Sequence, residues 1–398
     1  MAHIVFIVPP LTGHINPSVA LGQMLMAAGH KVGWIGYQES LKKSLPHSDL
    51  IHPLSSELTV QQLGRLHQGR DKRGLAAFQF LWEGVLIPLA LQSYHEILNY
   101  VEQLQPDLCI VDQQTLSGAL VCQKLGIPWF TSASTSAALV DALAPLPKVK
   151  EWYQNQLQQL VTDLALTHVK NDHPIDLSPH GVLVFSSRTL CQSTMNESSF
   201  PAHFHFVGPA IQTQRTPIDF PWEKLDSTRR KIFVSLGTVN SEKGSRFYQV
   251  VIDALADSAY QVIMVAPSHM IKYTPANFIV KDRVPQLDLL SHMDLVICHG
   301  GHNTTCESLA HGIPLMIAPI KDDQPIVAQQ VVSCGAGIRV RFGRVKAQQL
   351  KSAVTTLLQE TSYRQAAQKI QVEFEQLQQQ QTALKLISKF LDETRSQT

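Results

Sequence analysis

The stretch that decides the fold is residues 295–331, which read LVICHGGHNTTCESLAHGIPLMIAPIKDDQPIVAQQV. Apolar runs and turn glycines divide it into a strand at 295–298, a turn at 299–301, a helix at 303–310 and a strand at 315–318. Gly312 and Pro314 lie just past the helix, where they stop it. This order of elements points a helix N-terminus at the carboxyl edge of a parallel sheet.

The start of this helix is suited to an anion such as a phosphate. Backbone N–H groups and the positive end of the helix dipole both attract negative charge. Gly300 and Gly301 carry no Cβ, so a ligand can approach the backbone closely. His299, Asn303 and Thr304 add side-chain donors, and we therefore expect a diphosphate to bind here.

Carboxylates near this helix can hold sugar hydroxyls. Glu307 lies four residues after Asn303, on the same helix face and about 6 Å further along the axis. A carboxylate there can accept both hydroxyls of a ribose. Asp323 and Gln324 follow the next predicted strand and could hold the hydroxyls of a donor sugar.

The order and spacing of these residues resemble the nucleotide-sugar signature of the UDP-glycosyltransferase family of GT-B enzymes. The matching residues are His299-Gly300-Gly301, Asn303-Thr304, Glu307, His311-Gly312-Ile313-Pro314 and Asp323-Gln324. The resemblance implies an α/β chain of GT-B fold, with two Rossmann-like domains facing a central cleft. It looks closest to bacterial enzymes that glycosylate macrolides, carotenoids and other natural products.

The same stretch allows two alternative interpretations. Its histidines and cysteines could indicate a metal site: Cys298, His299, His302, Cys306 and His311. No paired Cys-x-x-Cys is present, so zinc is disfavoured and we expect no bound metal. A purely structural role for the stretch is the second alternative.

The composition describes a globular chain long enough for two domains. The chain has 398 residues, of which 44% are hydrophobic and 16% charged, and its formal net charge is +1. This balance does not indicate nucleic acid as a partner. Six cysteines are scattered without the spacing of a disulfide framework, which fits a reducing cytosol.

The ends and apolar runs favour a cytoplasmic location. A strand begins within three residues of Met1 and no basic segment precedes it, so no signal peptide is expected. No apolar run reaches membrane-spanning length without a polar interruption. Peripheral membrane contact stays open, and the sequence does not decide between a monomer and a homodimer.

The N-terminus opens like a Rossmann domain. Residues 3–8 predict a strand, residues 9–14 a turn, and Pro17 opens a helix that runs through Ala28. The turn lacks G-x-G-x-x-G, so a dinucleotide site is disfavoured. It also resembles the N-terminus of the same glycosyltransferases, in which the residue aligned with His14 is the catalytic base.

A second candidate follows the predicted strand 108–111. This strand ends at Asp112, which places a carboxylate at the carboxyl edge of the N-terminal sheet. In the family that it resembles, the aligned residue pairs with the histidine base. A strand-end aspartate could instead cap the following helix, and that alternative stays open.

The segment 74–95 is unusually apolar. A buried helix pair is one interpretation, and a wall of a lipophilic acceptor pocket is the other. The second makes Phe78, Phe80 and Trp82 acceptor-binding candidates, together with Trp152 from an irregular stretch further along.

The domain boundaries follow from Phe206-Val207-Gly208-Pro209, which matches the family's end of the first domain. We predict an acceptor domain at 1–211, a linker at 212–227, a nucleotide-sugar domain at 228–380 and a helix returning to the first domain at 381–398.

The second domain carries the other donor-site candidates, all taken from the resemblance. Gly237 and Thr238 form a turn used against the diphosphate, and the loop from Val284 to Gln286 holds the base by its backbone. Many family members have a tryptophan where this chain has Arg283, whose planar guanidinium could stack on uracil instead.

The sequence therefore predicts an inverting, metal-independent glycosyltransferase. It would move a sugar, with glucose the first choice, from a UDP-sugar to a hydroxyl of a lipophilic natural product, and no cofactor is expected. A nucleotide-sugar epimerase of GT-B fold and a non-catalytic glycosyltransferase-like partner protein are the alternatives.

Overall fold

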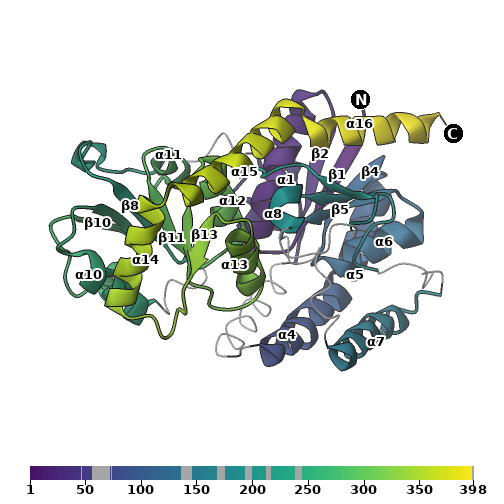
Figure 1. Cartoon of the computed structure of the whole chain (residues 1–398). Helices are drawn as coiled ribbons and strands as arrows, with labels where there is room; N and C mark the ends of the chain where they lie inside the picture. The colour runs from purple at the N-terminus through teal and green to yellow at the C-terminus, as the bar shows by residue number, and fades with distance from the viewer. Residues whose placement is uncertain are drawn as a thin grey trace. The chain divides into compact units, whose positions relative to one another are not determined.

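The structure is a computed structural model of the chain (Figure 1). It describes residues 1–45, 47–55, 72, 74–135, 146–167, 175–192, 200–211, 217–237 and 244–396. The chain divides into two compact units. The first unit comprises Met1–Phe185, Ser198–Thr213 and Leu377–Thr398, and the second comprises Ser186–Glu197 and Gln214–Gln376.

The first unit is built on a parallel sheet of seven strands within its described residues. Their order is β3 (Ile51–Leu54), β2 (Lys31–Tyr37), β1 (His3–Ile7), β4 (Leu108–Asp112), β5 (Trp129–Ala133), β6 (Val182–Val184) and β7 (Phe204–Phe206). Its longer helices are α1 (Thr12–Ala27), α5 (Ile87–Leu104), α6 (Leu116–Leu125), α7 (Pro147–Asp163) and α16 (Thr382–Arg395). Shorter helices are α2 (Gln38–Leu41) and α4 (Leu75–Leu81).

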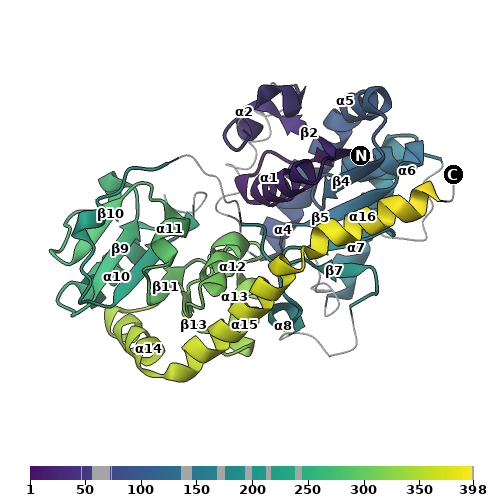
Figure 2. The ribbon, with the colours of Figure 1, turned by 90° about the horizontal axis from the view of Figure 1, so that it is seen from above.

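The strands of this sheet are mostly apolar because helices cover both faces. Alternate residues of a strand point to opposite faces, and the core divides accordingly. Val5 and Ile7 of β1 pack in a cluster with α5, α6 and α7, whereas Ile4 and Phe6 pack in another with α1 and α16. Figure 2 shows α1 and α16 beside the sheet.

The apolar segment 74–95 is one continuous helical stretch, Leu75–Leu104, and not the predicted helix pair. A π-helical turn at Trp82–Leu86 joins α4 to α5. By length and composition the stretch could cross a membrane, contrary to our expectation, and 28% of its most apolar window is buried. Core helices of soluble proteins pass the same test. From Leu89 onward, the buried residues of this stretch belong to the core of the first unit.

The second unit repeats the architecture. Within the residues described, its sheet has six parallel strands in the order β10 (Phe278–Lys281), β9 (Gln261–Val265), β8 (Lys231–Ser235), β11 (Leu295–Cys298), β12 (Leu315–Ile317) and β13 (Gly337–Arg339). Its helices are α8 (Arg188–Gln192), α10 (Ser245–Leu255), α11 (Gln286–Leu290), α12 (His302–Ala310), α13 (Gln324–Ser333), α14 (Ala347–Gln359) and most of α15 (Thr361–Gln379). Val234 faces α10 and α14, and Phe233 faces the other helices.

Two segments of the chain belong to the unit that their sequence position would not indicate. The short helix α8 follows β6 of the first unit, but its Leu190 is fully buried in the core of the second. Conversely, α16 belongs to the first unit, where Ile387 packs against the sheet and Arg395 donates to the Met1 carbonyl at 2.7 Å. The segment predicted as a linker is assigned to the second unit from Gln214 onward, and Phe220 lies in the core there.

The helix α1 begins earlier than the sequence pattern indicated. We expected a turn at 9–14 with Pro17 as the first helical residue, but the helix starts at Thr12 and contains Pro17 as its sixth residue. Proline has no N–H, so the bond that residue 17 would donate to the Gly13 carbonyl is missing from this helix. His14 is therefore a residue of the first helical turn, which fixes its backbone more firmly than a loop would.

Candidate active site

The site residues of the first unit lie where the strand order of the sheet reverses. Strands β1 and β4 are neighbours, with Ile7 paired to Val111, although they are far apart in the chain. Counting outward from them, the sheet continues to β2 on one side and β5 on the other. In parallel α/β sheets, ligands bind at the carboxyl ends of strands at this kind of switch point. His14 follows β1, and Asp112 ends β4.

His14 and Asp112 are hydrogen-bonded to one another. The Nδ1 atom of His14 lies 3.0 Å from both carboxylate oxygens of Asp112. The Asp112 side chain is fully buried, whereas 15% of the His14 side chain is exposed. A buried carboxylate that accepts from Nδ1–H fixes the tautomer in which Nε2 carries the lone pair. The structure thus brings together two residues that the sequence predicted as a pair.

The alternative role for Asp112 was to cap the next helix. In the structure its carboxylate instead bonds to the turn before that helix. Its Oδ1 atom accepts from the backbone N–H of Gln114 at 2.9 Å, which closes a turn after the strand. The N-cap position of α6 is Thr115, with no side-chain capping bond. The same carboxylate therefore shapes the turn and orients His14.

Sequence reasoning missed Ser134. Its hydroxyl lies 2.6 Å from His14 Nδ1 and donates to Asp112 Oδ2 at 2.9 Å. A serine one residue past a buried strand carries no local signal of such a contact. The pairing of β5 beside β4, with Ser132 opposite Asp112, could have indicated it.

The second unit has an equivalent switch point. Strands β8 and β11 are neighbours, with Ser235 paired to Cys298. Gly237 follows β8 and His299 follows β11, and the two residues are in contact. A Cβ placed on Gly237 would lie 2.6 Å from the His299 ring, and one on Gly301 would lie at the same distance. The His299 ring therefore leaves no space for a side chain at Gly237 or Gly301, a constraint that the sequence did not reveal.

His299 is a neutral histidine at physiological pH. Burial lowers its pKa from 6.5 to about 4, against the opposing effects of the Asp323 carboxylate and a backbone hydrogen bond at Ser235. The ring can still donate an N–H to an anion, as expected from the sequence. The His299 ring therefore carries no positive charge before an anion binds.

Glu307 is held in place by a second predicted residue. The carboxylate is buried, at 6% exposure, and its Oε2 accepts from the side-chain amide of Gln286 at 2.5 Å. Gln286 begins α11, and Glu307 is in α12. We expected only the backbone of the 284–286 loop to matter, whereas the structure shows that the Gln286 side chain positions the carboxylate.

The loop before α13 is organised by Gln324. Its side-chain oxygen accepts from the backbone N–H groups of Ile320 and Lys321, at 2.8 and 3.0 Å. Asp322 in the same loop has φ +56°, a conformation that few non-glycine residues adopt. Because the Gln324 oxygen is engaged, only its amide N–H atoms remain to meet a sugar, while Asp323 lies close enough to influence His299.

The remaining predicted donor residues lie at the ends of these elements. The helix α12 begins at His302, so Asn303 and Thr304 are in its first turn, where backbone N–H groups have no partner within a helix. Val284 is buried after β10. Thr238 lies outside the described residues. In the part of the chain that the structure describes, no cluster of three or more histidine, cysteine or acidic side chains could hold a metal ion.

Arg283 is exposed at the end of β10. Its neighbour Asp282 accepts from the Ser268 backbone N–H at 2.8 Å. The sequence alone also allowed Arg283 to point to solvent or to pair with Asp282. No ion pair joins Arg283 to another described residue. Stacking on a base stays a prediction.

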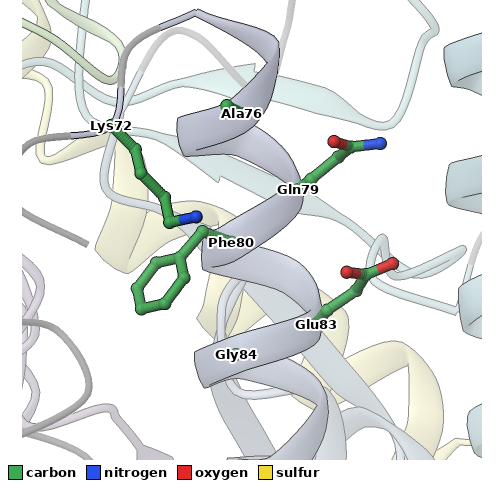
Figure 3. Close-up of a pocket in the computed structure, with 6 residues that line it drawn as sticks. All are labelled: Lys72, Ala76, Gln79, Phe80, Glu83 and Gly84. Carbon is green, nitrogen blue, oxygen red and sulfur yellow. The ribbon is translucent and has the colours of Figure 1, made fainter. Parts of the chain in front are cut away.

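The four acceptor-side aromatic residues separate into two groups. Phe78, Trp82 and Trp152 pack with Tyr153, and Trp82 is buried at 8% exposure, so it has little surface to offer a ligand. Phe80 instead lines a cavity of about 270 Å³ on α4 and the π-helical turn (Figure 3).

This cavity is not a purely apolar wall. Half of its lining residues are polar: Lys72, Gln79 and Glu83. The Lys72 amine lies 5.3 Å from the centre of the Phe80 ring. Glu83 accepts from the indole N–H of Trp152 at 3.1 Å, which joins the π-helical turn to α7.

Comparison with known proteins is consistent with this architecture. Residues 249–383 match the family described as Erythromycin biosynthesis protein CIII-like, C-terminal domain. The chain is 26% identical to an uncharacterized UDP-glucosyltransferase, YojK, of Bacillus subtilis, over 93% of each chain. It is 28% identical to the NDP-glycosyltransferase YjiC of the same organism, over 88% of each chain. The resemblance to the UDP-glycosyltransferase family of GT-B enzymes is confirmed.

The solved structures agree on the fold of this chain. The glycotransferase of kitacinnamycin superimposes with a TM-score of 0.78 at 21% identity, covering 98% of this chain and 99% of that one. The GT-B prediction of two parallel-sheet α/β domains is thus correct. The relatives support a transferase and favour neither the epimerase nor the non-catalytic partner protein.

The buried His299 predicts a pH-dependent stability. The unfolded chain takes up a proton at this residue near pH 6.5, whereas the folded chain does so only near pH 4. The free energy of unfolding should therefore fall by about 3 kcal/mol through His299 as the pH is lowered across this window. Urea unfolding at several pH values measures the effect.

The matched variants are His299→Gln, which cannot titrate, and His292→Gln, at an exposed position in the same unit. The His299→Gln protein should lose less stability between pH 7 and pH 4 than the wild type, and the His292→Gln protein should follow the wild type. An identical pH dependence in all three proteins would contradict the burial of a neutral His299.

Proposed function

We propose that this protein is an inverting glycosyltransferase that moves a sugar, with glucose the first choice, from a UDP-sugar to a hydroxyl of a lipophilic natural product. The observation that carries the proposal is the His14–Asp112 pair, with Nδ1 at 3.0 Å from both carboxylate oxygens. The family description of the matched C-terminal domain, which names erythromycin biosynthesis, supports the acceptor class.

The first unit supplies the base. With Nδ1–H donated to Asp112, the Nε2 lone pair of His14 can take the proton of an acceptor hydroxyl as its oxygen attacks the anomeric carbon. The imidazolium that forms is stabilised by the buried carboxylate, which itself stays ionised. The bond from the anomeric carbon to the diphosphate oxygen breaks on the opposite face, so the anomeric configuration inverts.

The second unit holds the leaving group. The N-terminus of α12 directs N–H groups and a positive dipole end toward an anion, and His299 adds a neutral donor beside it. Because these donors are provided by the protein, the proposal includes no metal ion and no further cofactor. A diphosphate bound here would raise the pKa of His299 by its negative charge.

The remaining recognition roles are proposed residue by residue. Glu307, fixed by Gln286, accepts the ribose hydroxyls, and Asp323 with the amide of Gln324 meets the sugar hydroxyls. Arg283 is exposed and lies just before the buried Val284, from where its guanidinium can cover a uracil ring. A cytoplasmic location belongs to the same proposal.

A direct test is a screen of hydroxylated natural products with UDP-glucose, read by mass spectrometry. The proposal expects at least one lipophilic acceptor to gain a hexose. A parallel incubation of UDP-glucose without acceptor, followed by NMR, should show no epimerised nucleotide sugar. Epimerisation in that control would replace the transferase with the alternative activity.

Replacing His14 should lower kcat strongly and leave the affinity for the donor nucleotide nearly unchanged. In His14→Ala no group accepts the acceptor proton, so kcat should fall by about 10² or more. The donor residues all lie in the second unit, so the Kd for UDP should change less than about 2-fold. Steady-state kinetics and calorimetric titration with UDP give the two quantities.

His95→Ala serves as the control, because His95 is an exposed histidine of the same unit. Its turnover should match the wild type. If His14→Ala retains near-wild-type turnover, His14 is not the base.

The position of Glu307 predicts a preference for ribose over deoxyribose. A buried carboxylate that loses the 2′-hydroxyl as a partner costs about 1–3 kcal/mol, which corresponds to about 5- to 150-fold in kcat/KM. UDP-glucose should therefore exceed 2′-deoxy-UDP-glucose and dTDP-glucose by this factor. Comparing the two deoxy donors separates the effect of the missing 2′-hydroxyl on kcat/KM from the effect of the thymine methyl group.

The variant Glu307→Gln should reduce the discrimination between UDP-glucose and its 2′-deoxy form. Equal kcat/KM values for the two donors in the wild type would show that Glu307 does not read the 2′-hydroxyl.

A further inference from the structure

Ser134 lies between the two residues of the proposed catalytic pair. Its Oγ is 2.6 Å from His14 Nδ1, which is closer than either carboxylate oxygen of Asp112, each at 3.0 Å. The same hydroxyl donates to Asp112 Oδ2 at 2.9 Å. The imidazole is therefore linked to the carboxylate both directly and through the serine.

With the ring hydrogen on His14 Nδ1, the donors and acceptors of this group satisfy one another. Ser134 has one hydrogen, and it is donated to Asp112 Oδ2. The oxygen can then accept, so the hydrogen on His14 Nδ1 points between the serine and the carboxylate. The other carboxylate oxygen, Oδ1, accepts from the Gln114 backbone. Each oxygen of the buried carboxylate thus has a donor besides His14.

We propose that Ser134 is a positioning residue of the transfer reaction: it holds the Asp112 carboxylate and the His14 ring in the one tautomer that leaves Nε2 able to accept a proton. The inference rests on the proposed function, because it gives His14 the role of base. It adds Ser134, which follows β5, to the His14–Asp112 pair on which that function depends.

The need for both a donor and an acceptor explains the residue type. Alanine would remove the donor to Oδ2 and the nearest partner of Nδ1 together, which leaves the imidazole freer to rotate or to carry its hydrogen on Nε2. Threonine keeps a hydroxyl at the same position. A purely structural serine would instead affect the fold and leave the chemical step alone.

Ser132 offers a matched control. It lies two residues earlier on β5, is fully buried, and its hydroxyl has no hydrogen-bond partner among the residues that the structure describes. The variant Ser132→Ala therefore removes a buried serine hydroxyl two residues from Ser134 without removing a hydrogen bond from His14 or Asp112. Its melting temperature and kcat report what a buried serine at this strand end contributes in general.

The test is a double-mutant cycle in the full-length protein, with kcat and the donor KM measured at saturating acceptor. Ser134→Ala should lower kcat by about 10-fold with the donor KM unchanged. In the Asp112→Asn protein the tautomer is already wrong, so adding Ser134→Ala should change kcat by less than about 2-fold. Ser134→Thr should recover most of the loss, and Ser132→Ala should match the wild type.

A second arm does not depend on activity. NMR of protein labelled with ¹⁵N histidine distinguishes the two ring nitrogens, and the His14 signals are assigned by their loss in His14→Gln. The wild type should show hydrogen on Nδ1 at neutral pH, Ser134→Thr the same, and Ser134→Ala a mixture of tautomers.

The two arms separate the failure of this inference from the failure of the proposed function. If the wild type glycosylates nothing but the tautomer changes in Ser134→Ala, the function is wrong and the positioning role stands. If Ser134→Ala keeps both the tautomer and a kcat within 2-fold of wild type, or if it loses the same factor in the Asp112→Asn background, Ser134 has no positioning role.

Discussion

The pairing of strands that are distant in the chain is the constraint on which the candidate residues of each unit depend. In the first unit β1 lies beside β4, and in the second β8 lies beside β11. Each pairing reverses the strand order of a parallel sheet, so the chain leaves the two strands in opposite directions and their carboxyl ends stay accessible. Helix α1 carries His14 to one such edge, and helix α12 begins at the other.

Burial then gives the polar groups at these edges their chemistry. Asp112 can remain a carboxylate out of water because backbone, serine and imidazole donors surround it. Burial has the opposite effect on His299, because it lowers the pKa of the ring and keeps it neutral. Gly237 and Gly301 leave the space that the ring occupies. One histidine is thus placed to take a proton, whereas the other is placed to donate a hydrogen bond without a charge.

The local pattern of the sequence was sufficient for most strands and for the motif residues. Strand β11 has the predicted bounds, and the predicted pair of His14 and Asp112 is hydrogen-bonded. What it could not give are contacts between side chains that lie far apart in the chain. Ser134 is 120 residues from His14. The close approach of the His299 ring to Gly237, which leaves no space for a Cβ there, depends on the register of two strands. The placement of α8 in the second unit follows from which core buries Leu190, which periodicity does not specify. The return of a final helix to the first domain was an expectation from the family resemblance, not from periodicity. The early start of α1 was missed because Pro17 is a typical first helical residue.

The central claim is that a base in the first unit activates an acceptor hydroxyl for a single displacement at the anomeric carbon. The anomeric configuration of the product tests this most directly. With UDP-α-glucose as donor and any acceptor that the protein glycosylates, the ¹H NMR coupling of the anomeric proton should identify a β-glucoside. An α-glucoside would contradict the account, because one displacement assisted by His14 cannot retain the configuration.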